Sequence, residues 1–371
     1  MTEIERLPDD ILATLATYGF DRERFDSLRD RIASGTLSAE SNIVDGELVA
    51  PESDAWDEQP KKGSDELEEA REAGAKAIAA GHVGALILNG GMATRFGGVV
   101  KGIVQALPGK SFLALKVQNV VRESRIHGGR IPVFMMNSFS TDEATRAHFE
   151  EHKNLGLPED DLEFYTQGVS LRLEKDGELF LDDEERPSLY GPGHGDCPIW
   201  FRRSGCLERF LDAGGRYLMI SNVDNLAARI DPVVLGRHIL SKKKLTAEVA
   251  PKWPGDKGGS PAWVDGKLWV VEGFRFPEDF NQDSIPVFNT NTFTVNADQL
   301  DRHFDLTDCY VSKTVQDREV IQIETLVGEL TKFLPTRYLK VKRTGKSSRF
   351  FPIKTPADLD DGREDLELIC G

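Results

Sequence analysis

A short apolar strand leading directly into a glycine-rich turn sets the strongest limit on the architecture of this chain. Residues 85–88 read Ala-Leu-Ile-Leu, which is typical of a strand buried on both faces. Residues 89–98, NGGMATRFGG, follow at once and contain four glycines, which let a backbone approach a ligand closely. A strand that ends in such a turn offers backbone N–H groups to phosphate oxygens, and the cations Arg95, Lys101 and Lys110 lie on or just after it. We therefore predict a nucleotide-binding loop at the carboxyl end of this strand.

The turn matches neither of two common nucleotide-loop patterns. Gly109-Lys110-Ser111 ends like a P-loop, but that pattern requires glycine where Val104 stands. The dinucleotide pattern G-x-G-x-x-G fails as well, because Met92 follows Gly90-Gly91. The pattern present is G-G-x-[GA]-T-R-x-G with downstream lysines, and the alternative reading is a tight turn without a ligand.

Composition excludes several classes of function. A chain of 371 residues can form one large α/β domain with additions, or two domains. Its formal net charge of −16 disfavours a nucleic-acid-binding surface. Four cysteines without paired or zinc-like spacing, an acidic N-terminus and no apolar run of membrane-spanning length indicate a cytoplasmic protein with no membrane partner.

Strand and helix patterns alternate along the chain, which predicts an α/β fold with a mostly parallel mixed sheet, flanking helices and inserted β-hairpins. Strands are expected over 85–88, 131–136, 162–166, 216–221 and 286–295. Two short helices are expected over 1–35, and longer ones over 64–81, 111–124, 231–242 and 319–333. A further helix is expected after Ser140, which forms a capping box with Glu143. Asp176-Gly177 and Asp265-Gly266 predict hairpin turns.

Two further stretches place polar groups where a ligand would bind. Tyr217–Asn225 is an apolar strand that ends in Asp224 with asparagines on both sides, at the same sheet edge as the glycine turn. One carboxylate beside substrate phosphates suits Mg²⁺. Gly191–Asp196 holds His194 between glycines, where the ring can donate to a phosphate or a hydroxyl. The alternative readings are a turn or helix cap for Asp224 and a structural turn for His194.

The segment His148–His152, HFEEH, also matches a zinc-peptidase signature. Its two histidines share one helix face, as a metal pair must. The helix is rich in other charged residues, so a solvated helix face is the competing interpretation. A zinc metallopeptidase is the distant alternative function.

Taken together, the motifs resemble those of the eukaryotic-type UTP–glucose-1-phosphate uridylyltransferase family. The G-G-x-[GA]-T-R-x-G turn is how sugar-1-phosphate nucleotidyltransferases begin. The other stretches follow in the family's order over about residues 84–360: 137–141, 191–196, 221–225, 257–259, 288–291, 321–325 and 349–355. The resemblance implies a Rossmann-like nucleotidyltransferase core. We expect an N-terminal helical segment and linker over 1–80, the catalytic domain over 81–360 and a C-terminal tail over 361–371.

The resemblance also implies roles for individual residues. Asn89, Gly90, Gly91, Gln167 and Asn222 would bind the nucleotide, with Gln167 at the base edge. Asp224 would bind Mg²⁺. Arg95, Lys101, Lys110 and Lys354 would act on the phosphates, Arg95 and Lys101 taking the leaving pyrophosphate. His194, Gly195, Asn225, Gly259, Asn291 and Glu324 would line the sugar-phosphate side.

Some residues depart from the family's pattern. Ala93 stands where glycine is usual, and Arg95 and the lysine spacing resemble the N-acetylhexosamine branch. Thr292 and Thr294 replace residues that are usually asparagine and tryptophan, beside the expected sugar contact. The chain ends soon after Lys354, so the family's C-terminal β-helix is expected to be missing.

The expected reaction is a Mg²⁺-dependent, direct in-line transfer that joins a nucleoside triphosphate and a sugar 1-phosphate and releases pyrophosphate, because no residue pair suggests a covalent intermediate. UTP with glucose 1-phosphate is the favoured pair. GTP with a sugar-like cyclitol phosphate, and a non-catalytic sugar-nucleotide-binding protein, are the alternatives. The oligomeric state is left open.

Overall fold

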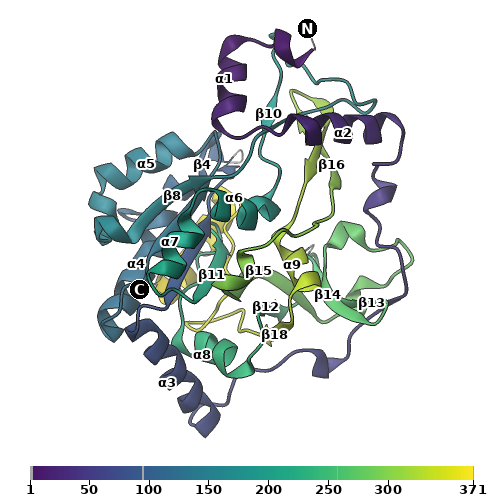
Figure 1. The fold of residues 1–371 in the computed structure, drawn as a ribbon. Helices are drawn as coiled ribbons and strands as arrows, with labels where there is room; N and C mark the ends of the chain where they lie inside the picture. Colours follow the sequence, from purple (N-terminus) through teal and green to yellow (C-terminus); the bar gives the residue numbers. More distant parts are fainter. Residues whose placement is uncertain (1–2, 94–95, 257, 371) are drawn as a thin grey trace.

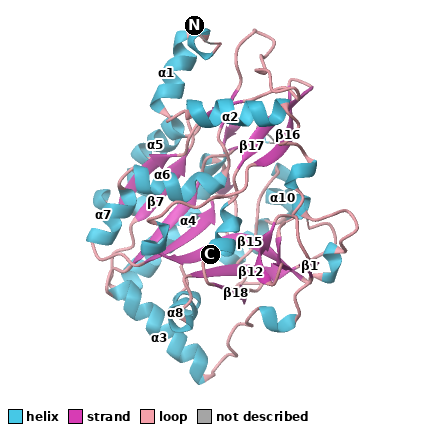
Figure 2. Cartoon of the chain, turned by 45° about the vertical axis from the view of Figure 1, so that its right-hand side comes forward, coloured by secondary structure: helices cyan, strands magenta, loops and turns pink. Residues whose placement is uncertain are grey.

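A seven-stranded mixed sheet forms the centre of the molecule (Figures 1 and 2). The computed structural model describes residues 3–93, 96–256 and 258–370, and within them the strand order is β18-β12-β15-β11-β2-β7-β8. β15 is antiparallel to both of its neighbours, and the other pairs in this sheet are parallel. The strands are β2 Val83–Leu88, β7 Val133–Asn137, β8 Leu162–Thr166, β11 Tyr217–Asn222, β12 Leu245–Pro251, β15 Val287–Asn296 and β18 Thr336–Lys340. The predicted α/β class with a mostly parallel sheet is confirmed.

Helices cover both faces of this sheet. One face carries α3 Asp65–Ala79, α4 Phe112–His127, α5 Asp142–Glu151 and α8 Pro232–Ser241. The other face carries α6 Cys197–Arg203, α7 Cys206–Asp212 and α9 Leu330–Phe333. Ser64 caps α3 and Ser111 caps α4, each accepting a hydrogen bond from the backbone N–H three residues on.

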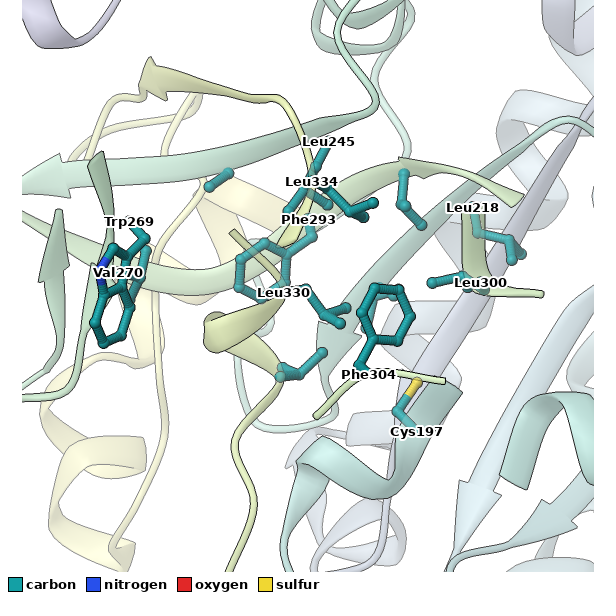
Figure 3. Close-up of a cluster of buried hydrophobic side chains, with 14 of the residues drawn as sticks. Cys197, Leu218, Leu245, Trp269, Val270, Phe293, Leu300, Phe304, Leu330 and Leu334 are labelled. Carbon is teal, nitrogen blue, oxygen red and sulfur yellow. The ribbon is translucent and has the colours of Figure 1, made fainter. Parts of the chain in front are cut away.

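Strand β2 shows why the apolar run 85–88 forms a central strand. Ala85 and Ile87 pack into the core under α3 and α4. Leu86 and Leu88 point the other way, into the core that includes α6 and α7. Figure 3 shows part of this second cluster, where Leu218 of β11 and Phe293 of β15 meet residues from α6 and α9. Burial on both faces favours a continuous apolar strand over an alternating one.

Smaller elements surround the central sheet. The hairpin of β13 and β14 turns at Asp265-Gly266 as predicted, and the two predicted N-terminal helices are α1 and α2. These helices pack on β9 and β17 in a separate apolar cluster, and Figure 2 shows α2 beside β17. The remaining elements are α1 Asp9–Thr17, α2 Arg22–Ala33, β1 Leu48–Val49, β3 Met92–Ala93, β4 Val99–Val100, β5 Gln105–Leu107, β6 Lys110–Ser111, β9 Ser170–Leu171, β10 Leu189–Tyr190, β13 Ser260–Val264, β14 Lys267–Val271, β16 Cys309–Val315, β17 Arg318–Glu324, α10 Pro356–Asp361 and α11 Arg363–Cys370, besides short 3₁₀ turns.

Two secondary-structure predictions are wrong, and a third is confirmed only in part. Residues 319–324 form the strand β17 and not a helix, because the β-branched Val320, Ile321 and Ile323 pair along β16, and only 330–333 are α-helical. The N-cap of α5 is Thr141, and no side chain caps it, because the Ser140 hydroxyl bonds Ser138 instead. The predicted hairpin at Asp176-Gly177 is reduced to a single bridge between Leu173 and Leu179.

No helix in the described part of the chain is long and apolar enough to cross a bilayer.

Candidate active site

The carboxyl ends of the parallel strands bring several predicted residues to one edge of the sheet. Asn89 follows β2, Gln167 follows β8, and Asn222 ends β11. Because β15 runs the other way, its first half lies at the same edge, with Thr292 paired to Ser221. Ligands in open α/β sheets bind at this edge.

Gln167 lies against the glycine turn. A Cβ atom at Gly90 would lie 2.9 Å from Gln167 Nε2, and one at Gly191 would lie 1.9 Å from it. Gly90 and Gly191 therefore leave the space that the Gln167 amide fills, whereas Gly91 faces open space. Ser138 Oγ donates to the Gly90 carbonyl at 2.9 Å and holds the turn in place. Sequence analysis missed this role of Gly191.

Asn89 is fully buried and supports the turn from below. Its Nδ2 donates to Asn137 Oδ1 and to Thr145 Oγ1, both at 2.9 Å. Its Oδ1 lies under Gly102, where a Cβ atom would come within 2.5 Å. Asn89 therefore contributes to the ligand-binding edge through the backbone of the turn, which its side chain supports.

Lys101 and Asp224 form an ion pair at the centre of this edge. Lys101 Nζ lies 2.6 Å from Asp224 Oδ2, and the two side chains are 16% and 18% exposed. The Asp224 carbonyl accepts the Ile353 N–H at 3.1 Å, so the exposed Lys354 is adjacent in the chain to a residue bonded to Asp224. Neither Lys354 nor the partly exposed Lys110 forms an ion pair within the described residues. Arg95, predicted to act on the same phosphates, lies outside the described residues.

Lys116 positions the segment that carries Asp224, and sequence analysis missed it. Its Nζ is buried and donates to Ser221 Oγ at 2.7 Å, the Ala228 carbonyl at 2.8 Å and the Asn225 carbonyl at 3.2 Å. Burial lowers the pKa of Lys116 to about 7. One sequence signal could have identified this role: Lys116 stands at a position on the apolar face of the helix that begins at Phe112.

Asn225 joins the same segment to the C-terminal part of the chain. Its Nδ2 donates to the Arg349 carbonyl at 3.2 Å, and its Oδ1 accepts the Phe351 N–H at 2.9 Å. Nδ2 also reaches Thr292 Oγ1 at 3.4 Å. Its amide is therefore engaged by the protein itself. Thr292 and Thr294 are both buried, so neither offers a surface to a ligand.

Asn291 adopts a left-handed backbone conformation inside β15, with φ at 54°. The pairing of β12 with β15 shifts register here, between Ala247 and Val249. Asn291 Nδ2 donates to Asn222 Oδ1 at 2.9 Å, which joins a predicted sugar-side residue to a predicted nucleotide-side residue. A non-glycine residue with positive φ inside a strand is a feature often found at functional sites.

The glycine-flanked histidine is held against the end of β17. A Cβ atom at Gly195 would lie 2.4 Å from the Thr325 carbonyl carbon, so glycine permits this contact. His194 Nδ1 accepts the Val327 N–H at 3.0 Å, which leaves the proton on Nε2. Burial lowers the pKa of His194 to about 4, so the ring is neutral at pH 7 and Nε2 is a hydrogen-bond donor. Glu324, at the end of β17, is partly exposed and lies 3.4 Å from Lys313 Nζ.

Glu272 is a second residue that sequence analysis missed. Its carboxylate would lie 3.0 Å from a Cβ atom at Gly259 and 3.3 Å from one at Gly328. Burial raises the pKa of Glu272 to about 7. A carboxyl group with a perturbed pKa beside a predicted sugar contact is a candidate for ligand binding.

The paired histidines do not form a metal centre with other residues. His148 Nε2 lies 2.8 Å from Ser111 Oγ and ties α5 to the start of α4. His152 stacks on His148, with ring centroids 4.3 Å apart. In the described part of the chain no three His, Cys, Asp or Glu side chains converge as metal ligands. The pair has a packing role here.

Most of the chain is similar to known proteins. The family model described as UTP–glucose-1-phosphate uridylyltransferase matches residues 23–364. A UTP–glucose-1-phosphate uridylyltransferase 2 of Dictyostelium discoideum is 32% identical over 294 residues, which are 74% of this chain and 57% of that protein. The potato (Solanum tuberosum) enzyme of the same description is 29% identical over 76% of this chain and 61% of its own length. This chain therefore spans about three fifths of these curated relatives.

Solved structures share the fold. A Trypanosoma brucei uridine diphosphate N-acetylglucosamine pyrophosphorylase, at 20% identity, superposes with a TM-score of 0.77 over 95% of this chain and 79% of its own. A Leishmania major UDP-glucose pyrophosphorylase variant in complex with UDP-glucose has 25% identity and a TM-score of 0.63, over 89% of this chain and 73% of its own.

Proposed function

Because the chain belongs to the UTP–glucose-1-phosphate uridylyltransferase family, we propose that it transfers a uridylyl group from UTP to glucose 1-phosphate. The observation that carries the proposal is the accessible Lys101–Asp224 pair at the carboxyl edge of the parallel strands. It combines a phosphate-binding cation with a metal-binding carboxylate. The UDP-glucose complex of the Leishmania protein supports the choice of product class.

In the proposed reaction a phosphate oxygen of the sugar 1-phosphate attacks the α-phosphorus of UTP. The bond from that phosphorus to the oxygen bridging to the β-phosphate breaks, and its electron pair leaves with pyrophosphate. Both reactants are anions, so the chain has to neutralise and align them. Lys101, Lys110, Lys354 and Arg95 supply positive charge, which a chain of net charge −16 must concentrate at its site.

Asp224 suits Mg²⁺ because it is a carboxylate with partly exposed surface, and the described residues place no cluster of three or more His, Cys, Asp or Glu side chains around it. Mg²⁺ takes one or two protein carboxylates and fills its other positions with phosphate oxygens and water. Bound there, the ion would supply charge stabilisation to the phosphates. Lys101 would exchange its bond to Asp224 for one to a phosphate.

Other residues position the two reactants in the proposed complex. Gln167, held between two glycines, presents an amide beside the turn that would receive the base. His194 donates from Nε2 toward the sugar-phosphate side, because Val327 occupies Nδ1. Asn291 of β15 donates to Asn222 at the end of the neighbouring strand β11 and holds its side chain in place.

The test is pyrophosphate release from UTP, GTP, ATP, CTP and dTTP, each with Mg²⁺ and a panel of sugar and cyclitol 1-phosphates. We expect release with UTP and glucose 1-phosphate. Pyrophosphate release only with another pair, such as GTP and a cyclitol 1-phosphate, would support the proposed reaction type but show that the proposed substrates are wrong. Silence across the panel, with nucleotide sugars still bound, would favour a non-catalytic binding protein.

A further inference from the structure

A cavity of about 420 Å³ lies behind the histidine loop, away from the Lys101–Asp224 pair. We call it the α2–α6 cavity, because Arg24, Phe25 and Leu28 of α2 line one side and residues 198–203 of α6 line another. The segment 302–306 closes a third side. Figure 1 shows α2 passing above α6 at the top of the molecule. The volume is in the usual range for small-molecule sites, which often form where separate parts of a chain meet.

The N-terminal helices are seated closely on the core at this place. A Cβ atom at Gly19, in the turn between α1 and α2, would lie 2.0 Å from ring carbon Cη2 of Trp200. The Trp200 indole N–H in turn donates to Asp196 Oδ2 at 3.1 Å. The turn between α1 and α2 is therefore packed directly against α6 beside the cavity.

The wall of the α2–α6 cavity is apolar where it is buried. Phe25, Leu28, Val169 and Phe304 line it and are each at most 8% exposed. Removing the apolar part of a ligand from water against these side chains favours binding.

The rim of the cavity is positively charged. Arg203 and Arg302 are exposed, Arg202 is partly exposed, and none of the three forms an ion pair with a described carboxylate. Arg203 lies over the Trp200 ring at 5.3 Å, and Arg302 donates to the Phe333 carbonyl at 3.1 Å. Both are held near the rim while most of their guanidinium hydrogens stay available.

Two of the acidic residues at the cavity are engaged by N–H groups of the protein. Asp21 caps α2 by accepting the Arg24 N–H at 3.0 Å, and Asp196 accepts the Gly168 N–H at 3.2 Å besides the Trp200 bond. Arg24 is paired with Asp308. His303 and Asp305 complete the charged lining. Three arginines without an ion-pair partner among the described residues therefore lie at the cavity beside a further exposed acid, Asp305, in a chain whose net charge is −16.

We infer that the α2–α6 cavity binds a small amphipathic anion, a phosphate monoester with an apolar body, at a site separate from the proposed active site. The apolar body lies against Phe25, Leu28 and Phe304, and the phosphate meets the arginines at the rim. Arginine suits this head group because its planar fork donates two hydrogen bonds to phosphate.

The cavity shares a wall with the proposed active site, which makes it a candidate regulatory site. Gly168 follows Gln167, and Gly195 and Asp196 follow His194, so both sites use the same two segments. A ligand in the cavity would bias the position of the His194 loop. Binding in the cavity does not depend on the proposed reaction.

The test is isothermal titration of phenyl phosphate into the whole chain without nucleotide. We expect Arg203→Glu/Arg302→Glu to weaken binding at least tenfold, and the matched double charge reversal Lys76→Glu/Lys243→Glu, on exposed residues elsewhere, to leave it unchanged. Leu306→Trp, which fills the partly exposed rim without adding charge, should weaken it as well. Inorganic phosphate should bind more weakly than phenyl phosphate because it has no apolar body. Melting temperatures establish that each variant is folded.

A further variant separates this site from the proposed active site. Lys110→Ala/Lys354→Ala alters the proposed phosphate contacts and should leave phenyl phosphate binding intact. The inference is overturned if the wild-type chain does not bind, if the arginine variant binds as the wild type does, or if only the lysine variant loses binding. Failure of the pyrophosphate assay would leave this result untouched, so the two proposals fail separately.

Discussion

Two ion pairs near the same edge of the sheet differ in almost every physical respect. Arg349 meets Glu248 through two hydrogen bonds of 2.5 and 2.6 Å, with side chains 4% and 0% exposed. Lys101 meets Asp224 through one contact of 2.6 Å, with both side chains in reach of solvent. A buried charge left without its partner is costly, whereas an exposed one is readily solvated. The first pair thus suits a permanent support and the second an exchangeable binding group.

The two pairs are connected by the chain between them. Arg349 sits five residues before Lys354, and its carbonyl accepts a hydrogen bond from Asn225, the neighbour of Asp224. The buried pair anchors the segment 349–354 to β12, and within that segment the Ile353 N–H donates to the Asp224 carbonyl. The buried Arg349–Glu248 pair gives rigid support to the accessible Lys101–Asp224 pair, and a preorganised site requires such support.

The largest expected effect is on the accessible pair. Asp224→Ala should lower turnover about a thousandfold or more, because a charge-stabilising group at a phosphoryl transfer centre contributes several kcal/mol. Lys354→Ala should also abolish turnover without unfolding the protein. Pyrophosphate release gives the rate, and urea unfolding should show a smaller loss of stability for Asp224→Ala than for a variant of the buried pair, because both side chains of the Lys101–Asp224 pair reach solvent. Near-normal activity in a folded Asp224→Ala protein would show that Asp224 is not part of the active site.

The buried pair should show the opposite pattern. Glu248→Gln should lower the free energy of unfolding by about 3–5 kcal/mol, because it leaves the Arg349 guanidinium buried beside a neutral amide. The double variant Glu248→Gln/Arg349→Met, measured in the same urea titration, should recover part of this loss. If Glu248→Gln were no more destabilising than Asp224→Ala, the contrast between the two pairs would be wrong.

Lys116 tests whether the support below Asp224 matters for the reaction. Lys116→Met keeps the apolar stem and removes the three hydrogen bonds, so we expect a loss of about 2–3 kcal/mol in unfolding free energy. We also expect a fall in kcat larger than any change in KM, since Asp224 would be displaced. The matched control Lys110→Met lacks these bonds and should leave stability within about 0.5 kcal/mol. Unchanged kcat in a destabilised Lys116→Met protein would limit Lys116 to a folding role.

Sequence patterns predicted the parts of the molecule that local rules determine. The apolar run before Asn89 and the Asp265-Gly266 turn are local signals, and the structure confirms them. The position of Asp224 at the strand edge follows from the general rule for parallel sheets.

Contacts between distant residues could not be predicted in this way. Lys101 and Asp224 are 123 residues apart, and Arg349 and Glu248 are 101 residues apart. The apolar pattern of residues 319–324, taken by itself, is compatible with a helix. The segment forms a strand because it pairs with β16. Glu272 meets Gly259 only because the β13–β14 hairpin brings the two ends of its strands together.

The smallest expected effect concerns Glu272 and pH. Its pKa is raised to about 7 by burial, from an ordinary value near 4.5, so the folded state holds a proton that the unfolded state has lost. Its contribution to stability is therefore present below about pH 4.5 and is lost as pH rises through 7. Glu272→Gln cannot ionise, so its free energy of unfolding relative to wild type should increase by about 1–2 kcal/mol between pH 5 and pH 8. Urea titrations at both pH values measure this, with the exposed Glu278→Gln as the matched control expected to show no such change. A flat difference for Glu272→Gln would mean that the Glu272 carboxylate is solvated in the folded protein and stays charged.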